Sequence, residues 1–173
     1  MKNEILCGSA CVKYILDIKE IKNYNLNHRM WWATELALAL KENGIKNEIY
    51  CFNSSLYSDF ISKDVDLNFD GFKYLKKAFD NNISVTEKKL DIRELEIELK
   101  ENEYIILCVE SKVFNNDETM SGGHFVILNK TYGGKVRIIN PIKDKYENIK
   151  REKEEVVKYG ENFGSWRILI KGD

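Results

Sequence analysis

The chain of 173 residues contains no glutamine, one proline and two histidines. Because imidazoles are so few, any catalytic or metal-binding histidine must be His28 or His124. No run of about 18 apolar residues is present, which excludes a membrane-spanning helix. No apolar signal segment follows Met1. We therefore expect a cytoplasmic protein that does not associate with a membrane.

Neither the charge nor the cysteine content is extreme. Lysine and arginine number 27 against 28 aspartates and glutamates, so the net charge is −1. No strongly basic face for nucleic acid is expected from this balance. The four cysteines of a cytoplasmic protein are expected to be reduced rather than paired in disulfides. Apolar residues make up 43% of the chain, and the length predicts a single domain over residues 1–173.

The apolar spacing predicts helices first and strands afterwards. The expected helices cover residues 7–17, 31–43 with Gly44 as a stop signal, 72–79, and a segment after Asp91 as its N-cap. The expected strands cover residues 45–52, 83–85, 103–109, 124–130, 135–140 and 166–170. Residues 112–122 are expected to form a loop, and residues 147–158 a charged helix or loop. With a hairpin turn at residues 132–134, this order indicates the α+β class.

Cys7 stands at the expected start of the first helix and is followed by Gly8, Ser9 and Ala10. A helix N-terminus lowers the pKa of a thiol, and small residues allow a substrate to approach closely. The alternative for any cysteine is a small, buried and inert side chain. Cys11, one helical turn further along, fits that alternative better. We therefore favour Cys7 as a nucleophile.

His124 follows a double glycine and begins an apolar strand that can hold its ring at the edge of a cleft. His28 lies in a polar segment with no strand to orient it, so His124 is the preferred general base. Asn140 ends the partner strand, and Pro141 is expected to stop that strand. The Asn140 side-chain oxygen can accept a hydrogen bond from the imidazole and orient it. Its alternative role is that of a turn residue before proline, and the two roles are compatible.

Two other uses of the cysteines agree less well with their spacing. Cys7, Cys11 and a histidine could bind a metal, but cysteine-based zinc sites usually contain two close pairs. Redox-active pairs usually have two intervening residues, whereas three separate Cys7 from Cys11. We therefore expect neither a metal nor a cofactor.

Four pieces of the sequence resemble the papain-like cysteine peptidase superfamily, in particular its bacteriocin-processing (double-glycine) peptidase-like branch. They are Cys-Gly-Ser-Ala-Cys at 7–11, Trp-Trp-Ala-Thr-Glu-Leu at 31–36, Gly-His-Phe-Val-Ile at 123–127 and Ile-Asn-Pro at 139–141. This resemblance spans nearly the whole chain. It implies a papain-like fold, with the nucleophile helix packed on a C-terminal antiparallel sheet. It also implies that Cys7 is the nucleophile, His124 the base and Asn140 the residue that orients the base.

The chain departs from this branch at two positions. The branch usually has aspartate before the proline, where this chain has Asn140, although papain itself uses asparagine. The family also places a glutamine shortly before the nucleophile to help hold the oxyanion, and this chain has no glutamine. Asn3 is the candidate replacement, with the backbone N–H of Cys7 as the other donor.

The triad predicts an acyl-thioester on Cys7, with His124 moving the protons. Water as the attacking group would make the protein a peptidase or amidase, whereas an amine would make it an amide-forming acyltransferase. We favour the amine because a weakened oxyanion site suits an activated thioester donor. The expectation of a free-standing domain without a transporter or pro-segment points the same way. The superfamily includes acyltransferases that use carrier proteins, and a further resemblance is to the amide-forming enzyme of closthioamide biosynthesis.

The expected partners are an acyl donor, such as a carrier-bound thioester, together with a small amine, or alternatively a peptide. Asp117 and Glu118 are candidates for binding a cationic amine, with a solvated loop as the alternative. Trp31 and Trp32 are candidates for an acyl pocket, with the hydrophobic core as the alternative for them and for Trp166. A third hypothesis is a degenerate domain that binds a peptide or partner without catalysis. It predicts that function survives Cys7→Ala.

Overall fold

The computed structural model describes residues 6–52, 70–116, 118, 122–142 and 145–172. The helices are α1 (Cys7–Ile18), α2 (Ala33–Glu42), α4 (Asp70–Asp80), α5 (Ile92–Glu101), α6 (Ser111–Asn115) and α7 (Lys153–Glu161). The strands are β1 (Asn47–Cys51), β2 (Val85–Glu87), β3 (Tyr104–Glu110), β4 (Gly123–Tyr132), β5 (Lys135–Ile142), β6 (Lys145–Glu152) and β7 (Arg167–Ile170). Within these described ranges, no helix is both long and apolar enough to cross a bilayer.

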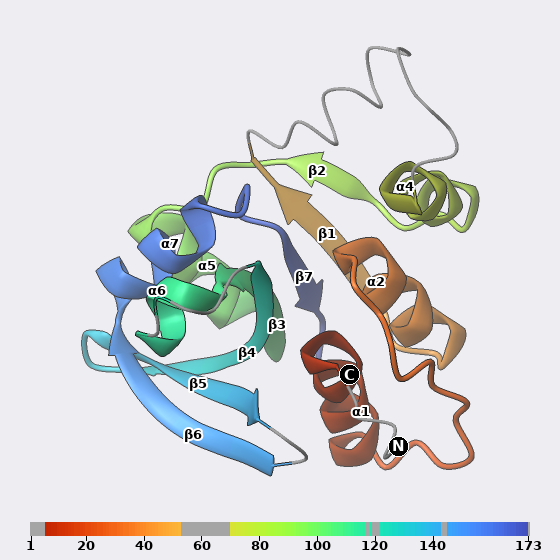
Figure 1. The fold of residues 1–173 in the computed structure, drawn as a ribbon, viewed down its shortest axis with the longest axis horizontal. Coiled ribbons are helices and arrows are strands. Elements are labelled where there is room, and N and C mark those ends of the chain that lie inside the picture. The colour runs from red at the N-terminus through yellow and green to blue at the C-terminus, as the bar shows by residue number, and fades with distance from the viewer. Residues whose placement is uncertain (1–5, 53–69, 117, 119–121, 143–144, 173) are drawn as a thin grey trace.

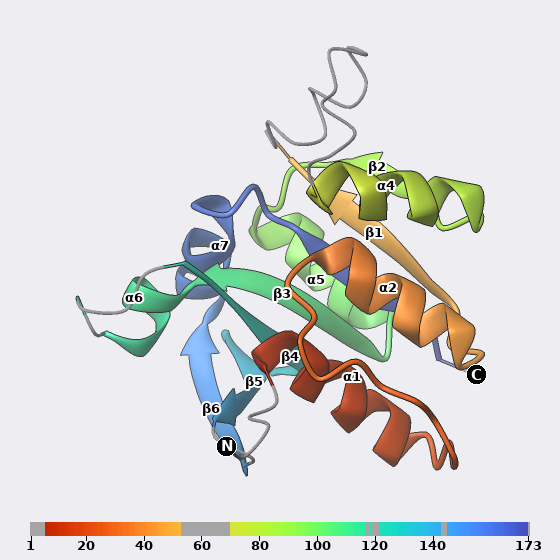
Figure 2. The ribbon, with the colours of Figure 1, turned by 45° about the vertical axis from the view of Figure 1, so that its right-hand side comes forward.

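The strands form one seven-stranded sheet in the order β2-β1-β7-β3-β4-β5-β6. Figures 1 and 2 show α1, α2 and α4 on one side of this sheet and α5 and α7 on the other. The helix α1 packs on β4 and β5, and α2 packs on β1 and β7. The chain is therefore a mixed α+β protein.

The sheet is mixed rather than purely antiparallel. Strands β1 and β2 pair in parallel, with Ile49 opposite Val85. A parallel pair needs a long crossover connection, and α4 lies on the connection between these two strands. The predicted strands at residues 45–52 and 83–85 are therefore confirmed as β1 and β2, whereas the expectation of a purely antiparallel sheet is wrong.

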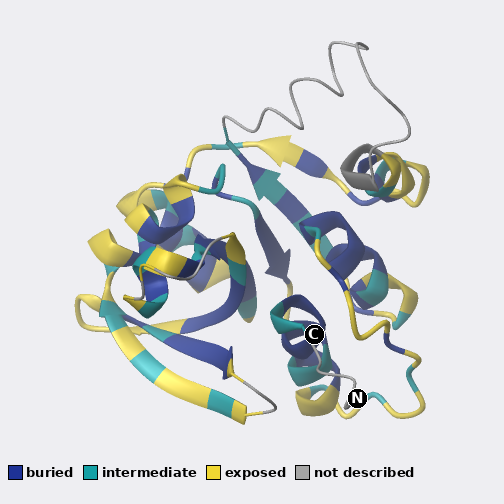
Figure 3. Cartoon of the chain, viewed as in Figure 1, coloured by how far each residue is buried: buried dark blue, intermediate teal, exposed yellow. Residues whose placement is uncertain are grey.

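Apolar side chains in the central strands alternate between two cores. In β3, Ile106 and Cys108 face the core beneath α1 and α2, whereas Ile105 and Leu107 face the core beneath α5 and α7. This two-sided burial explains why β3 has an almost continuous apolar run. Figure 3 shows the contrast between the buried central strands and the edge strand β6, which is mostly exposed or half-buried.

Two predicted helix signals are confirmed, and one helix start is shifted. Asp91 caps α5 by accepting the N–H of Glu94 at 2.8 Å. Gly44 follows α2 with φ +82°, a conformation in which glycine is favoured. Helix α2 begins at Ala33 rather than residue 31, because the Glu35 carboxylate accepts the N–H groups that precede the helix.

Three predictions in the C-terminal half are wrong in whole or in part. Residues 112–122 were expected to form a loop, but α6 occupies Ser111–Asn115. The charged helix or loop expected over residues 147–158 is confirmed as a helix from Lys153 onwards in α7, but residues 147–152 belong to β6, which has polar side chains on both faces. Pro141 does not stop β5, which continues to Ile142. The last described pair between β5 and β4 is Ile139 with Ile127, whereas Pro141 pairs with Tyr146 of β6 on the other side. The missing N–H of proline therefore removes no bond to β4.

Candidate active site

The first turn of α1 is fixed to the segment that precedes α2. The N–H of Leu6 donates to the carbonyl of His28, and the N–H of Met30 donates to the hydroxyl of Ser9, both at 3.0 Å. A Cβ atom at Gly8 would lie 2.9 Å from the carbonyl oxygen of Met30. Glycine is therefore required for this close approach, which sets the position of the neighbouring Cys7.

The structure brings Cys7, His124 and Asn140 together at the start of β4. The Nε2 atom of His124 lies 2.6 Å from Oδ1 of Asn140. An amide oxygen only accepts, so Nε2 carries the proton and Nδ1 remains for Cys7. The Cys7 thiol and the His124 imidazole lie close enough to perturb each other electrostatically. The Cys7 sulfur also accepts the N–H of Phe125 at 3.5 Å.

Electrostatics favour charge separation between Cys7 and His124. Burial raises the pKa of Cys7, but the adjacent His124 imidazole, with the N–H groups of Phe125 and Gly8, lowers it below the ordinary value. Burial lowers the pKa of His124, but Cys7 and then Asn140 raise it above its ordinary value. The N-terminus of α1 adds a partial positive charge near the sulfur. This arrangement favours a thiolate next to an imidazolium.

The other cysteines lack these features, although all four are free thiols. Cys11 is fully buried, and its thiol donates to the carbonyl of Phe125 at 3.4 Å. Burial and the neighbouring thiols raise the pKa of Cys11 well above its ordinary value. Burial also raises the pKa values of Cys51 and Cys108 to about 12. Among the described residues, no group of three or more potential metal ligands is assembled.

The imidazole of His124 is supported by an aromatic ring that sequence reasoning missed. The ring of Phe114 lies 5.8 Å from that of His124 between centroids, and Tyr159 packs edge-on against Phe114 at 5.5 Å. Phe114 belongs to α6, in the segment predicted to be a loop. No pattern of apolar residues marks a helix of five residues, so the sequence contained no signal for this contact.

A cavity of about 390 Å³ adjoins this site through Phe125, whose N–H contacts the Cys7 sulfur, although its described lining does not include the three residues themselves. Its walls come from the start of α2, from β3, from the start of β4 and from the segment between α7 and β7. They are formed by Trp31, Trp32, Ala33, Thr34, Cys108, Gly122, Gly123, Phe125, Phe163 and Trp166. Most of this lining is aromatic or small, and the volume lies within the range of small-molecule sites.

The predicted substrate residues have different outcomes. Trp31, Trp32 and Trp166 line the cavity. Glu118 is exposed and does not belong to the described lining, so its contact with an amine stays a prediction. Asn3 and Asp117, predicted for the oxyanion and the amine, lie outside the described residues.

Cys108 and Phe163 line the cavity without having been predicted. They lie on separate segments that only the folded sheet brings together, and neither belongs to a motif. Gly122 and Gly123, the double glycine noted before His124, also line this part of the cavity. His28, the histidine not preferred as a base, is exposed, and its backbone carbonyl holds Leu6.

The resemblance to papain-like proteins stays a prediction. Comparisons of the chain with protein-family models, with curated proteins and with solved structures each return no match.

Proposed function

We propose that this protein is a papain-like acyltransferase that forms amides through an acyl-thioester on Cys7. The observation that carries the proposal is the geometry around His124. Its Nε2 atom is held by Asn140 at 2.6 Å, and its ring lies beside the Cys7 thiol and lowers the pKa of that thiol. A nucleophile, a base and a residue that orients the base are the three parts that thiol catalysis requires.

Acylation begins with attack of the Cys7 thiolate on the carbonyl carbon of a thioester donor. The new carbon–sulfur bond produces a tetrahedral oxyanion next to the N-terminus of α1, where the Cys7 N–H can donate to it. Collapse of this intermediate expels the donor thiolate. The His124 imidazolium gives that thiolate its proton, leaving an acyl-enzyme beside a neutral imidazole.

Deacylation uses the neutral imidazole of His124 as a base. An amine attacks the thioester carbon and forms the carbon–nitrogen bond, and its surplus proton passes to Nδ1. The Cys7 thiolate then leaves, so that the amide departs and the thiolate–imidazolium pair is restored. Throughout both steps the Asn140 amide keeps the ring in one orientation.

Two observations favour an activated donor and an amine over a stable peptide and water. The chain has no glutamine to supply the usual second oxyanion donor. Removing one such donor costs roughly 10²–10³ in rate, which a reactive thioester tolerates better than an amide bond does. The cavity beside the thiol has mostly aromatic and small walls, which disfavour water near the acyl-enzyme. Hydrolysis by the same side chains is the competing reaction.

The proposal is tested by following the acyl-enzyme with intact-protein mass spectrometry. An N-acetylcysteamine thioester is added, excess donor is removed, and decay is followed with and without glycinamide as a small primary amine. We expect an acyl adduct on Cys7 that decays faster as glycinamide is increased and yields the amide. Decay at a rate independent of the amine, with free acid as the product, would identify a hydrolase.

Two variants complete this experiment. Cys7→Ala should prevent adduct formation, whereas Cys11→Ala, at the buried thiol one turn further along, should still form it. If Cys7→Ala retained every measurable function, a binding domain would be the correct description instead.

A further inference from the structure

The cavity described above begins at the residues that contact the Cys7 sulfur. Phe125 donates its N–H to that sulfur at 3.5 Å and also lines the cavity. A Cβ atom at Gly8 would lie 3.2 Å from the Phe125 ring, so this ring contacts both the turn that carries Cys7 and the cavity. A group attached to the acyl carbon on Cys7 can therefore reach the cavity along the Phe125 ring.

The described walls of the cavity are aromatic and uncharged, which favours a flat apolar group as the ligand. Rings of tryptophan and phenylalanine face small side chains, and none of the lining residues carries a charge. Flat apolar groups gain from such walls, both by burying area and by stacking or edge-on ring contacts. Two adjacent glycines of a peptide would leave most of a 390 Å³ space unfilled.

Trp31 gives an independent indication that the cavity binds a ligand. Its side chain is 67% exposed at the cavity wall, although tryptophan is usually well buried. The Glu35 carboxylate accepts the N–H of Trp31 at 2.8 Å and that of Trp32 at 3.1 Å, which fixes the backbone of this exposed segment. An exposed ring on a fixed backbone is suited to covering a bound aromatic group.

We infer that this cavity binds a planar aromatic group on the acyl side of the donor, so that the substrate class is an aromatic acyl thioester. The inference rests on the proposed function and specifies its donor. It also separates this chain from peptidases that cleave after a double glycine, because a glycine pair would make few contacts in the cavity.

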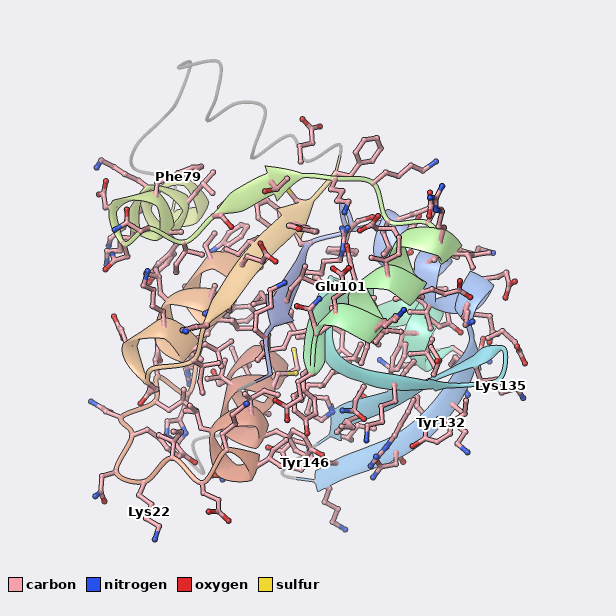
Figure 4. The ribbon with its side chains drawn as sticks, turned by 180° about the vertical axis from the view of Figure 1, so that it is seen from behind. Lys22, Phe79, Glu101, Tyr132, Lys135 and Tyr146 are labelled. Carbon is pink, nitrogen blue, oxygen red and sulfur yellow. The ribbon has the colours of Figure 1, made fainter. Side chains whose placement is uncertain are left out.

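The first test compares the acylation rates of Cys7 with three N-acetylcysteamine thioesters. Phenylacetyl should react about 10²-fold faster than acetyl at low concentration, because one ring is buried. Glycylglycyl should react no faster than acetyl. Trp31→Ala should reduce the phenylacetyl-to-acetyl ratio to less than about 10-fold. Tyr132→Ala, at an exposed aromatic residue at the far end of the β4–β5 hairpin (Figure 4), should leave this ratio unchanged. A glycylglycyl donor that reacts fastest would overturn the inference.

A second experiment measures binding alone and does not require acylation of Cys7. Cys7→Ser is titrated with phenylacetamide or acetamide while tryptophan fluorescence is recorded. Phenylacetamide should bind at least about 10-fold more tightly, and adding Trp31→Ala should abolish the difference. Equal binding of the two amides would overturn the inference even if Cys7 accepts acyl groups. Selective phenylacetamide binding without acylation would instead refute the proposed function and leave the aromatic site standing.

Discussion

The imidazole of His124 is held from two sides. The Asn140 amide lies 2.6 Å from Nε2, and the Phe114 ring packs against the imidazole with centroids 5.8 Å apart. Asn140 is itself only 2% exposed, so its amide has little freedom to turn away. At the scale of single residues, the orientation of the His124 ring thus depends on two buried neighbours, Asn140 and Phe114.

Replacing Asn140 with alanine should lower the acylation rate by about 10- to 100-fold, because one buried hydrogen bond to the base is lost. The pKa of His124 should also fall, since Asn140 helps to raise it. The imidazolium would then be lost at lower pH, so the alkaline limb of the pH–rate profile should move to lower pH.

The matched control for this variant is Asn129→Ala. Asn129 is also buried and donates its side-chain amide to the carbonyl of Glu103 at 3.1 Å. Its loss should affect stability without moving the alkaline limb. An unchanged limb in Asn140→Ala would show that Asn140 has no influence on the base.

Gly8→Ala should damage both stability and catalysis. The added Cβ would lie 2.9 Å from the Met30 carbonyl and 3.0 Å from a methyl group of Leu36. Overpacking of this kind costs about 1–3 kcal/mol, and it would displace the adjacent Cys7. Urea denaturation and the acylation rate measure the two effects. Gly134→Ala, where the nearest atom is the flexible carboxylate of Glu152 at 3.3 Å, should be tolerated. Equal results for the two variants would contradict the proposed close packing of the Gly8 turn.

At the scale of elements, α1 is held in place by side chains from distant segments. The hydroxyl of Tyr146 on β6 donates to the carbonyl of Ala10 at 2.9 Å, and its ring packs edge-on against Tyr14. Figure 4 shows Tyr146 at the end of β6 that lies near α1, whereas Tyr132 and Lys135 lie at the opposite ends of these strands. The edge strand therefore anchors the helix that begins with Cys7.

Sequence patterns were informative where elements are buried on one or both sides. They placed β3, the hairpin of β4 and β5, and the cap of α5 correctly. They missed β6, whose exposed edge position leaves polar residues on both faces, and α6, which is too short to show a period. They also missed the parallel pairing of β1 with β2, because pairing between distant strands leaves no mark on local periodicity.

A buried ion pair joins α5 to β7 and is expected to matter for stability. Arg167 bonds Glu98 through two nitrogens at 2.6 and 2.7 Å, and both side chains are almost fully buried. Arg167→Leu should lower the free energy of unfolding by about 3–5 kcal/mol, because Glu98 would lose its buried partner. Urea denaturation measures this change.

The double variant Arg167→Leu/Glu98→Leu should lose less stability than Arg167→Leu alone, since no buried charge remains. Lys76→Ala, which breaks the exposed pair with Asp80, should cost less than about 1 kcal/mol. A double variant less stable than the single variant would show that the pair contributes more through packing than through charge.

At the scale of the whole molecule, the site is assembled from segments far apart in the sequence. Cys7 and Phe125 are 118 positions apart, yet the N–H of one meets the sulfur of the other. The order of Cys7, His124 and Asn140 along the chain was sufficient to nominate these three residues. The cavity was not predictable beyond its tryptophans, because its walls come from α2, β3, β4 and the segment before β7.

The central claim is that folding produces an activated thiol from Cys7 and His124. The most direct test is the rate of iodoacetamide labelling at Cys7 as a function of pH, followed by peptide-resolved mass spectrometry. We expect a midpoint below the free-thiol value of about 8.5. In His124→Ala the midpoint should rise, because burial then acts on the Cys7 pKa without the opposing imidazole. His28→Ala, at the exposed histidine, should leave the profile unchanged. An ordinary thiol profile that His124→Ala does not alter would contradict the account.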